Sequence, residues 1–177
     1  RAALEMQPGS PTPPRAEPLM VAGSISGEAA AGASDAASSS LLGNLPEEAA
    51  TAALQGDEAA LLAWLDSGGR ANATCVVGGV SGYTPLMLAA NYGHKPANYG
   101  HERVVKLLLR HGAEINLQSN GGGTALMLAT GWDHPAVVLR LLRAGADTQL
   151  RSVNGKSALQ FAKERGHAAC VDAYRQH

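Results

Sequence analysis

From residue 45 to the end of the chain, apolar residues recur at the spacing of amphipathic helices. Short runs rich in Leu, Val and Ala are separated by polar residues, glycines and prolines, a pattern typical of helices that bury one face. The sequence predicts helices over 46–55, 102–111 and 135–144. Others are expected around Leu61–Leu65, after three hydroxyl residues described below, and in a final stretch containing Cys170, Val171 and Tyr174.

Hydroxyl residues mark the start of three of these helices. Thr84, Thr124 and Ser157 each precede a similar phrase, Thr-Pro-Leu-Met-Leu-Ala, Thr-Ala-Leu-Met-Leu-Ala and Ser-Ala-Leu-Gln-Phe-Ala. Ser and Thr are preferred N-caps, and proline suits the first helical position. The three caps stand 40 and 33 residues apart. A seven-residue duplication accounts for the difference, because the segment 91–97 begins with Asn-Tyr-Gly-His and is followed by a second Asn-Tyr-Gly-His at 98–101. Without this insertion both periods are 33.

A second landmark follows the same period. The glycines that close the second helices, Gly68, Gly112 and Gly145, each lie twelve residues after an inter-helix turn, at Gly56, Gly100 and Asp133. A period of 33 with a Thr-Pro-Leu-x-Leu-Ala phrase resembles the ankyrin repeat. The resemblance implies an all-α solenoid of helix-turn-helix repeats with short hairpin-like fingers. It also implies a non-enzymatic protein-binding module.

The repeats and their departures from the family pattern can be placed along the chain. We expect an N-terminal cap repeat over 45–72, a second repeat over 79–118 with the seven-residue insertion, a third over 119–151 and a C-terminal cap repeat over 152–177. The family phrase has His where this chain has Met87, Met127 and Gln160, so weaker hydrogen bonding between loops is expected. The first finger has four extra residues within 73–79, and the valines around Gly78-Gly79 predict a longer hairpin.

Residues 1–44 differ in composition from the rest of the chain. Five prolines are followed by an Ala/Gly/Ser tract, and a segment with few large apolar residues cannot offset its own ordering entropy. We expect this arm to be disordered alone or ordered on a partner. Because the chain begins with Arg1, a removed targeting segment and an incomplete sequence both remain open.

The charge balance, the cysteine content and the apolar runs indicate which partners and compartments suit this chain. The chain has 14 basic and 15 acidic residues and a net charge of −1, which disfavours nucleic acid as a partner. Two widely separated cysteines favour an intracellular, reducing compartment, either the cytoplasm or an organelle stroma or matrix. No run of 18 apolar residues occurs, so no membrane span is expected.

The histidines and one glycine-containing loop are the candidates for chemistry in this sequence. His94, His101, His134 and His167 occupy the turn between the two helices of their repeats, so local hydrogen bonds are favoured over metal ligation. The loop Asn154–Ser157 ends like a phosphate-binding loop but lacks its first glycine, because position 150 is Leu. We therefore expect no catalytic residue, cofactor or metal.

The resemblance also implies where a partner would bind. Residues that face the concave groove or the finger tips in this family correspond to Val80, Ser81, Tyr83, Asn91, Tyr92, Asn120, Gly121, Gly123, Trp132, Val153, Asn154, Lys156, Glu164 and Arg165. Among them we expect the aromatic residues to be exposed and to carry contact energy. The alternative is a permanent accessory subunit of a large assembly, such as one at an organellar or plastid membrane, anchored by the arm and the insertions.

Overall fold

The computed structural model describes residues 45–92 and 99–177. Over these residues the chain forms α1 (Glu47–Gln55), α2 (Glu58–Asp66), β1 (Cys75–Val77), β2 (Val80–Tyr83), α3 (Pro85–Asn91), α4 (Tyr99–Arg110), α5 (Ala125–Gly131), α6 (Pro135–Arg143), α7 (Ala158–Arg165) and α8 (Ala168–Arg175). The arm 1–44 and most of the duplicated heptad, residues 93–98, lie outside the described residues, and so do the expectations made for them.

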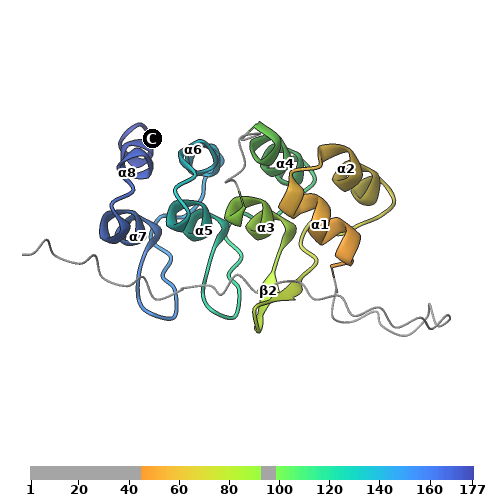
Figure 1. The fold of residues 1–177 in the computed structure, drawn as a ribbon, viewed down its shortest axis with the longest axis horizontal. Coiled ribbons are helices and arrows are strands. Elements are labelled where there is room, and N and C mark those ends of the chain that lie inside the picture. Colours follow the sequence, from red (N-terminus) through yellow and green to blue (C-terminus); the bar gives the residue numbers. More distant parts are fainter. Residues whose placement is uncertain (1–44, 93–98) are drawn as a thin grey trace, which may run out of the picture.

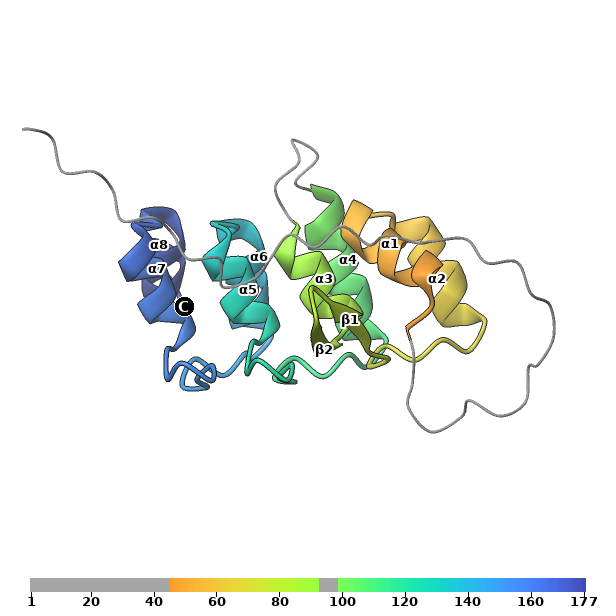
Figure 2. The ribbon, with the colours of Figure 1, turned by 60° about the horizontal axis from the view of Figure 1, so that its bottom comes forward.

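The helices stand in consecutive pairs that form two rows, as Figures 1 and 2 show. α1, α3, α5 and α7 make the inner row, each in contact with the next, and α2, α4, α6 and α8 make the outer row. The connections between the pairs project to one side as fingers (Figure 1). This is the helix-turn-helix solenoid that the sequence predicts.

Local side chains explain where the inner helices begin. Thr84 Oγ1 accepts a hydrogen bond from the Met87 amide at 3.3 Å, and Thr124 Oγ1 accepts one from the Met127 amide at 3.2 Å. Ser157 forms a full capping box with Gln160. These contacts satisfy amide groups that have no partner within the helix. The three predicted N-caps are confirmed.

Small differences from the predicted helices occur at two starts. Pro46 is extended, with ψ 145°, and acts as the N-cap, so α1 begins one residue later than predicted. α4 begins at Tyr99, three residues before the expected start at Glu102.

The core is built mainly from Leu, Val and Ala. Every residue of α3 is buried, and in α5 every residue except Gly131 is buried. Each buried Leu or Val contributes roughly 1.5 to 3 kcal/mol, and here it does so only because neighbouring repeats cover it. The two central inner helices therefore hold the row together and present almost no side chain to a partner.

The first finger folds as the predicted hairpin. β1 and β2 pair antiparallel with Cys75 opposite Tyr83 and Val77 opposite Val80. Gly78 and Gly79 at the turn have φ of 56° and 81°, values that favour glycine. The register shifts between the two pairs, and Gly82 there has φ 85°, as expected of a β-bulge.

Candidate protein-binding surface

Three histidines join successive repeats. His101 Nε2 lies 2.8 Å from the Leu54 carbonyl oxygen, His134 Nε2 lies 3.4 Å from that of Asn91, and His167 Nδ1 lies 2.8 Å from that of Thr130. Each acceptor is near the end of the inner helix of the preceding repeat. For these three histidines the expectation of local hydrogen bonds was therefore wrong, because the outer helix starts directly beside the previous repeat. His94, the fourth, lies outside the described residues.

These histidines do not form a metal site. In 45–92 and 99–177, no three His, Cys, Asp or Glu side chains are arranged to hold a metal ion.

The finger tips are bonded to one another by the main chain. The Asn120 amide donates to the Ser81 carbonyl at 3.0 Å, and the Val153 amide donates to the Gly121 carbonyl at 3.3 Å. The Asn120 side-chain amide also donates to Ser81 Oγ. Four of the residues expected to bind a partner are thus brought together in a row across three fingers, even though Met87 and Met127 replace the histidine of the family phrase.

The bases of the fingers are joined by a repeated side-chain contact. Asn72 Oδ1 accepts from the Glu114 amide at 2.8 Å, and Asn116 Oδ1 accepts from the Asp147 amide at 2.8 Å. Gln118 Nε2 bridges two fingers by donating to the carbonyls of Gly122 and Arg151, both at 2.9 Å. These side-chain amides were not predicted, although a repeated signal exists, because Asn72 and Asn116 each stand four residues after a closing glycine.

The close approach of the second and third fingers requires a glycine at position 122. Gly122 has φ 70°, and a Cβ atom there would lie 2.7 Å from the Val153 nitrogen and 2.9 Å from Ser152 Cα. Both contacts are to backbone, which cannot yield without moving the finger. The second and third fingers are therefore packed backbone to backbone at this tip.

Three of the expected contact residues are buried. Tyr83 is 1% exposed, Asn91 is 8% exposed and Gly123 is buried as well. Tyr83 ends β2, and burial raises the pKa of its phenol to about 12. Gly123 is closed in by two hydrogen bonds with Ser119, and Asn91 ends the fully buried helix α3. The expectation that Tyr83 and Asn91 face an open groove was wrong.

The remaining expected residues reach the surface to different degrees. Val153 is 72% exposed, and Asn154 and Asn120 are also exposed. Val80, Ser81, Gly121, Tyr92 and Trp132 are half-buried. Val76 of the first finger is 65% exposed and is not among the residues expected to bind a partner. The exposed residues of this set that could contact a partner therefore lie mainly at the finger tips.

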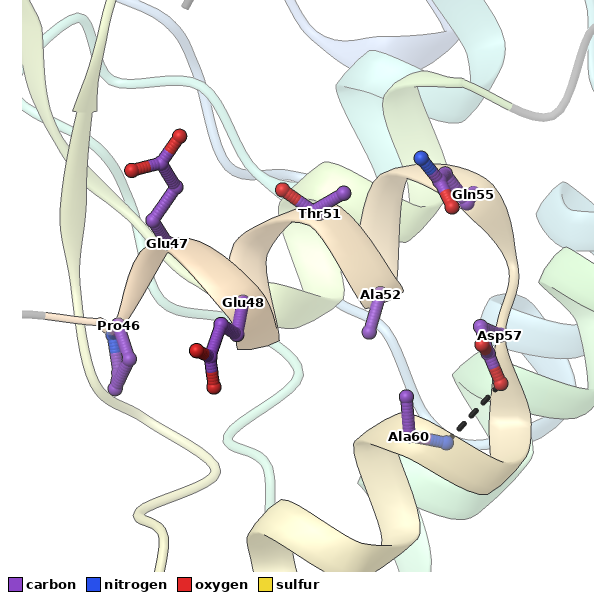
Figure 3. A pocket seen from close by; sticks show the side chains of 8 residues that line it. All are labelled: Pro46, Glu47, Glu48, Thr51, Ala52, Gln55, Asp57 and Ala60. Atoms are coloured by element: carbon purple, nitrogen blue, oxygen red, sulfur yellow. Dashed lines mark hydrogen bonds between the residues drawn. The ribbon is translucent and has the colours of Figure 1, made fainter. Parts of the chain in front are cut away.

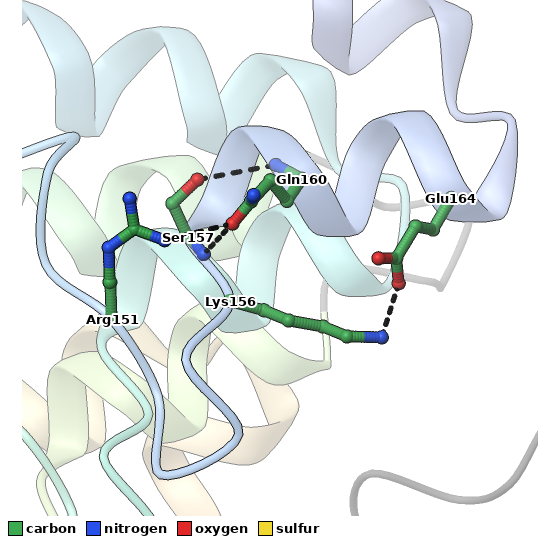
Figure 4. Close-up of polar contacts among 5 residues, drawn as sticks. All are labelled: Arg151, Lys156, Ser157, Gln160 and Glu164. Atoms are coloured by element: carbon green, nitrogen blue, oxygen red, sulfur yellow. Dashed lines mark hydrogen bonds and ion pairs between the residues drawn. The ribbon is translucent and has the colours of Figure 1, made fainter.

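At the last repeat the expected residues form specific polar contacts. Lys156 Nζ lies 2.6 Å from Glu164 Oε2 (Figure 4), so the finger is tied to α7. Arg165 donates to the Gly131 carbonyl at 2.8 Å, next to Trp132. These contacts tie the last finger to α7, and α7 to the end of α5.

The comparison with protein families agrees with this architecture. A family model described as ankyrin repeats (three copies) matches residues 49–152 and 94–174. The chain therefore belongs to the ankyrin repeat family, whose repeats generally bind proteins and are typically not catalytic. No curated protein matches the chain. Within the described residues, no helix is both long and apolar enough to cross a bilayer.

Proposed function

We propose that this chain is a non-enzymatic interaction module that binds a partner protein through its finger tips and the adjoining rim of the concave groove. The observation that carries the proposal is the row of fingers tied by the Asn120–Ser81 and Val153–Gly121 main-chain bonds. A surface fixed in advance loses little conformational entropy when a partner binds. The exposed valines at 76 and 153 supply apolar contacts at the two ends of the row.

The distribution of charged residues along the fingers indicates what kind of partner surface would bind there. No charged residue occurs from Cys75 to Asn91 or from Ile115 to Trp132. The third finger differs, because it carries Asp147 and exposed Arg151 besides Lys156, which is paired with Glu164. The partner surface should accordingly be uncharged and partly apolar where it meets the first two fingers.

A binding experiment with two matched variants tests the proposal. The partner is first captured from the native source, identified and purified, and its affinity is then measured by isothermal titration calorimetry. Val153→Asp should raise the Kd at least about tenfold, a change of about 1.4 kcal/mol. Leu62→Asp is the matched control, because Leu62 is 37% exposed on α2 in the outer row. Equal affinities of both variants would reject the finger tips as the binding surface.

The same material separates a transient module from a permanent accessory subunit. A permanent subunit would migrate entirely within one large assembly when the native extract is fractionated by size. A transient module would be found free as well, with the bound fraction rising with partner concentration.

A further inference from the structure

Two hollows lie at opposite ends of the repeat row, and they differ in charge. The first opens beside α1 and α2, where Glu47, Glu48 and Asp57 are the charged residues among the described residues that line it (Figure 3). The second opens beside α7 and α8, where two cations, Arg151 and Lys163, line it together with one carboxylate, Asp147. One hollow is thus acidic, and the other is predominantly basic.

Within 45–92 and 99–177, no salt bridge involves the charged residues of either hollow. Among the described residues, ion pairs join Arg140 with Glu102, Lys156 with Glu164 and Arg175 with Asp172, and none of these six residues lines either hollow. Arg151 bonds only to neutral groups, the Gly155 carbonyl at 2.8 Å and the Gln160 side chain at 3.4 Å.

The whole end repeats carry the same asymmetry. Residues 45–72 contain five carboxylates and one arginine, whereas residues 152–177 contain four lysines and arginines and two carboxylates. The two ends of the row therefore attract each other when they belong to different molecules, with a strength that salt reduces.

Small apolar surfaces accompany the charges. Ala60 in the acidic hollow is exposed, whereas the residues at the equivalent position of the later repeats, Val104, Val137 and Cys170, are buried. Half-buried Leu159 and Tyr174 line the basic hollow. An apolar centre with a charged rim is the usual composition of a protein interface.

We propose that copies of this chain associate end to end, the acidic hollow of one copy facing the basic hollow of the next. The two surfaces are different, so the contact is heterologous and one association leaves an open end for another. An acidic segment of another protein would suit the basic hollow alone, whereas a second copy uses both. Charge complementarity at both ends favours the second copy.

Analytical ultracentrifugation of the full chain and of charge-reversed variants tests this proposal. The wild-type weight-average mass should rise with concentration at about 0.05 M salt and return to the monomer at about 0.5 M, where the Debye length is much shorter. Glu47→Lys with Glu48→Lys makes both ends basic, and Arg151→Glu with Lys163→Glu makes both ends acidic. Each double variant alone should remain monomeric, whereas their equimolar mixture should associate.

A matched control separates the ends from net charge. Arg103→Glu with Arg110→Glu changes the net charge as much as the Arg151 and Lys163 variant does, but both arginines are exposed on α4, away from the hollows. This control should associate like the wild type, and circular dichroism verifies that each variant is folded.

Three results would overturn the proposal. They are a wild-type chain that is monomeric at every concentration in low salt, continued association of the Arg151 and Lys163 variant alone, and a mixture of the two variants that stays monomeric. A monomeric wild type that binds a polyglutamate peptide through Arg151 and Lys163 would instead assign the basic hollow to an acidic partner and overturn self-association.

Discussion

The ring of His101 donates a hydrogen bond from Nε2 to the main-chain carbonyl oxygen of Leu54, across 2.8 Å. Leu54 lies in the last turn of α1, where the carbonyl oxygens have no amide donor within the helix. His101 is 2% exposed, so water does not replace this bond easily. The contact joins the first repeat to the second, and His134 and His167 repeat it farther along the row.

Replacing His101 with Ala should lower the free energy of unfolding by about 1 to 3 kcal/mol, because the Leu54 carbonyl would lose its buried donor. Urea denaturation followed by circular dichroism measures the change. His111→Ala is the control, since His111 is exposed and exposed substitutions usually change stability by about 0.5 kcal/mol or less. Equal effects of the two substitutions would contradict a stabilising role for the histidine contact.

Gly122→Ala should destabilise the chain more than Gly155→Ala. Both glycines have similar φ, 70° and 72°, so alanine meets the same left-handed strain of roughly 1 to 2 kcal/mol at either position. Only Gly122 adds a backbone collision, with the Val153 nitrogen at 2.7 Å, whereas nothing lies within 4 Å at Gly155. Thermal unfolding of the two variants compares them directly, and indistinguishable melting temperatures would show that the fingers can move apart freely.

Tyr83→Ala should destabilise the chain by about 3 to 5 kcal/mol, the range measured for removal of large buried aromatic side chains. Tyr83 is among the largest fully buried side chains, whereas Tyr92 is half-buried. Tyr92→Ala is therefore the control and should cost clearly less in denaturant unfolding. A small loss for Tyr83→Ala would mean that its side chain can leave the core without disturbing the hairpin.

Stability should fall as the pH rises from about 9 to about 12. Burial raises the pKa of the Cys170 thiol from 9.0 to about 12, with a further increase from its hydrogen bond to Asp133. Burial also raises the pKa of Tyr83 and of Tyr174 from 10.0 to about 12. The unfolded chain loses these protons first, so the stabilisation is fully present below pH 9.0 and declines above it.

Denaturant unfolding at a series of pH values checks this alkaline decline. Cys170→Ala should flatten the slope between about pH 9 and 10, where the thiol is the first of these groups to titrate in the unfolded chain. A slope that stays as steep in this variant would exclude Cys170 as a source of the effect.

The helix starts could be predicted from the sequence because their causes are local. Thr84, Thr124 and Ser157 act through an amide three residues away, and such contacts need no knowledge of the rest of the fold. The burial of Tyr83 could not be predicted in this way. It depends on the pairing of Tyr83 with Cys75 across a hairpin lengthened by four residues, whereas the family pattern assigned that position to the open groove.

The histidines and the two end hollows depend on contacts or positions that the sequence alone does not predict. The position of His101 in the turn between two helices could be predicted, but its acceptor lies 47 residues earlier. A repeat pattern does not say which neighbouring repeat a side chain faces. Likewise, Glu47 and Arg151 belong to the first and last repeats, and only the solenoid places their hollows at opposite ends of one row.

The buried, uncharged inner helices α3 and α5 have a consequence for how such a chain can diverge. A substitution within Pro85–Asn91 or Ala125–Thr130 changes packing between repeats, so selection for folding constrains these segments tightly. Exposed tip residues such as Val76, Val153 and Asn154 carry no comparable constraint. Descendants of one ancestral chain could therefore keep the same helices and exchange only their tips, acquiring unrelated partners without passing through an unstable intermediate.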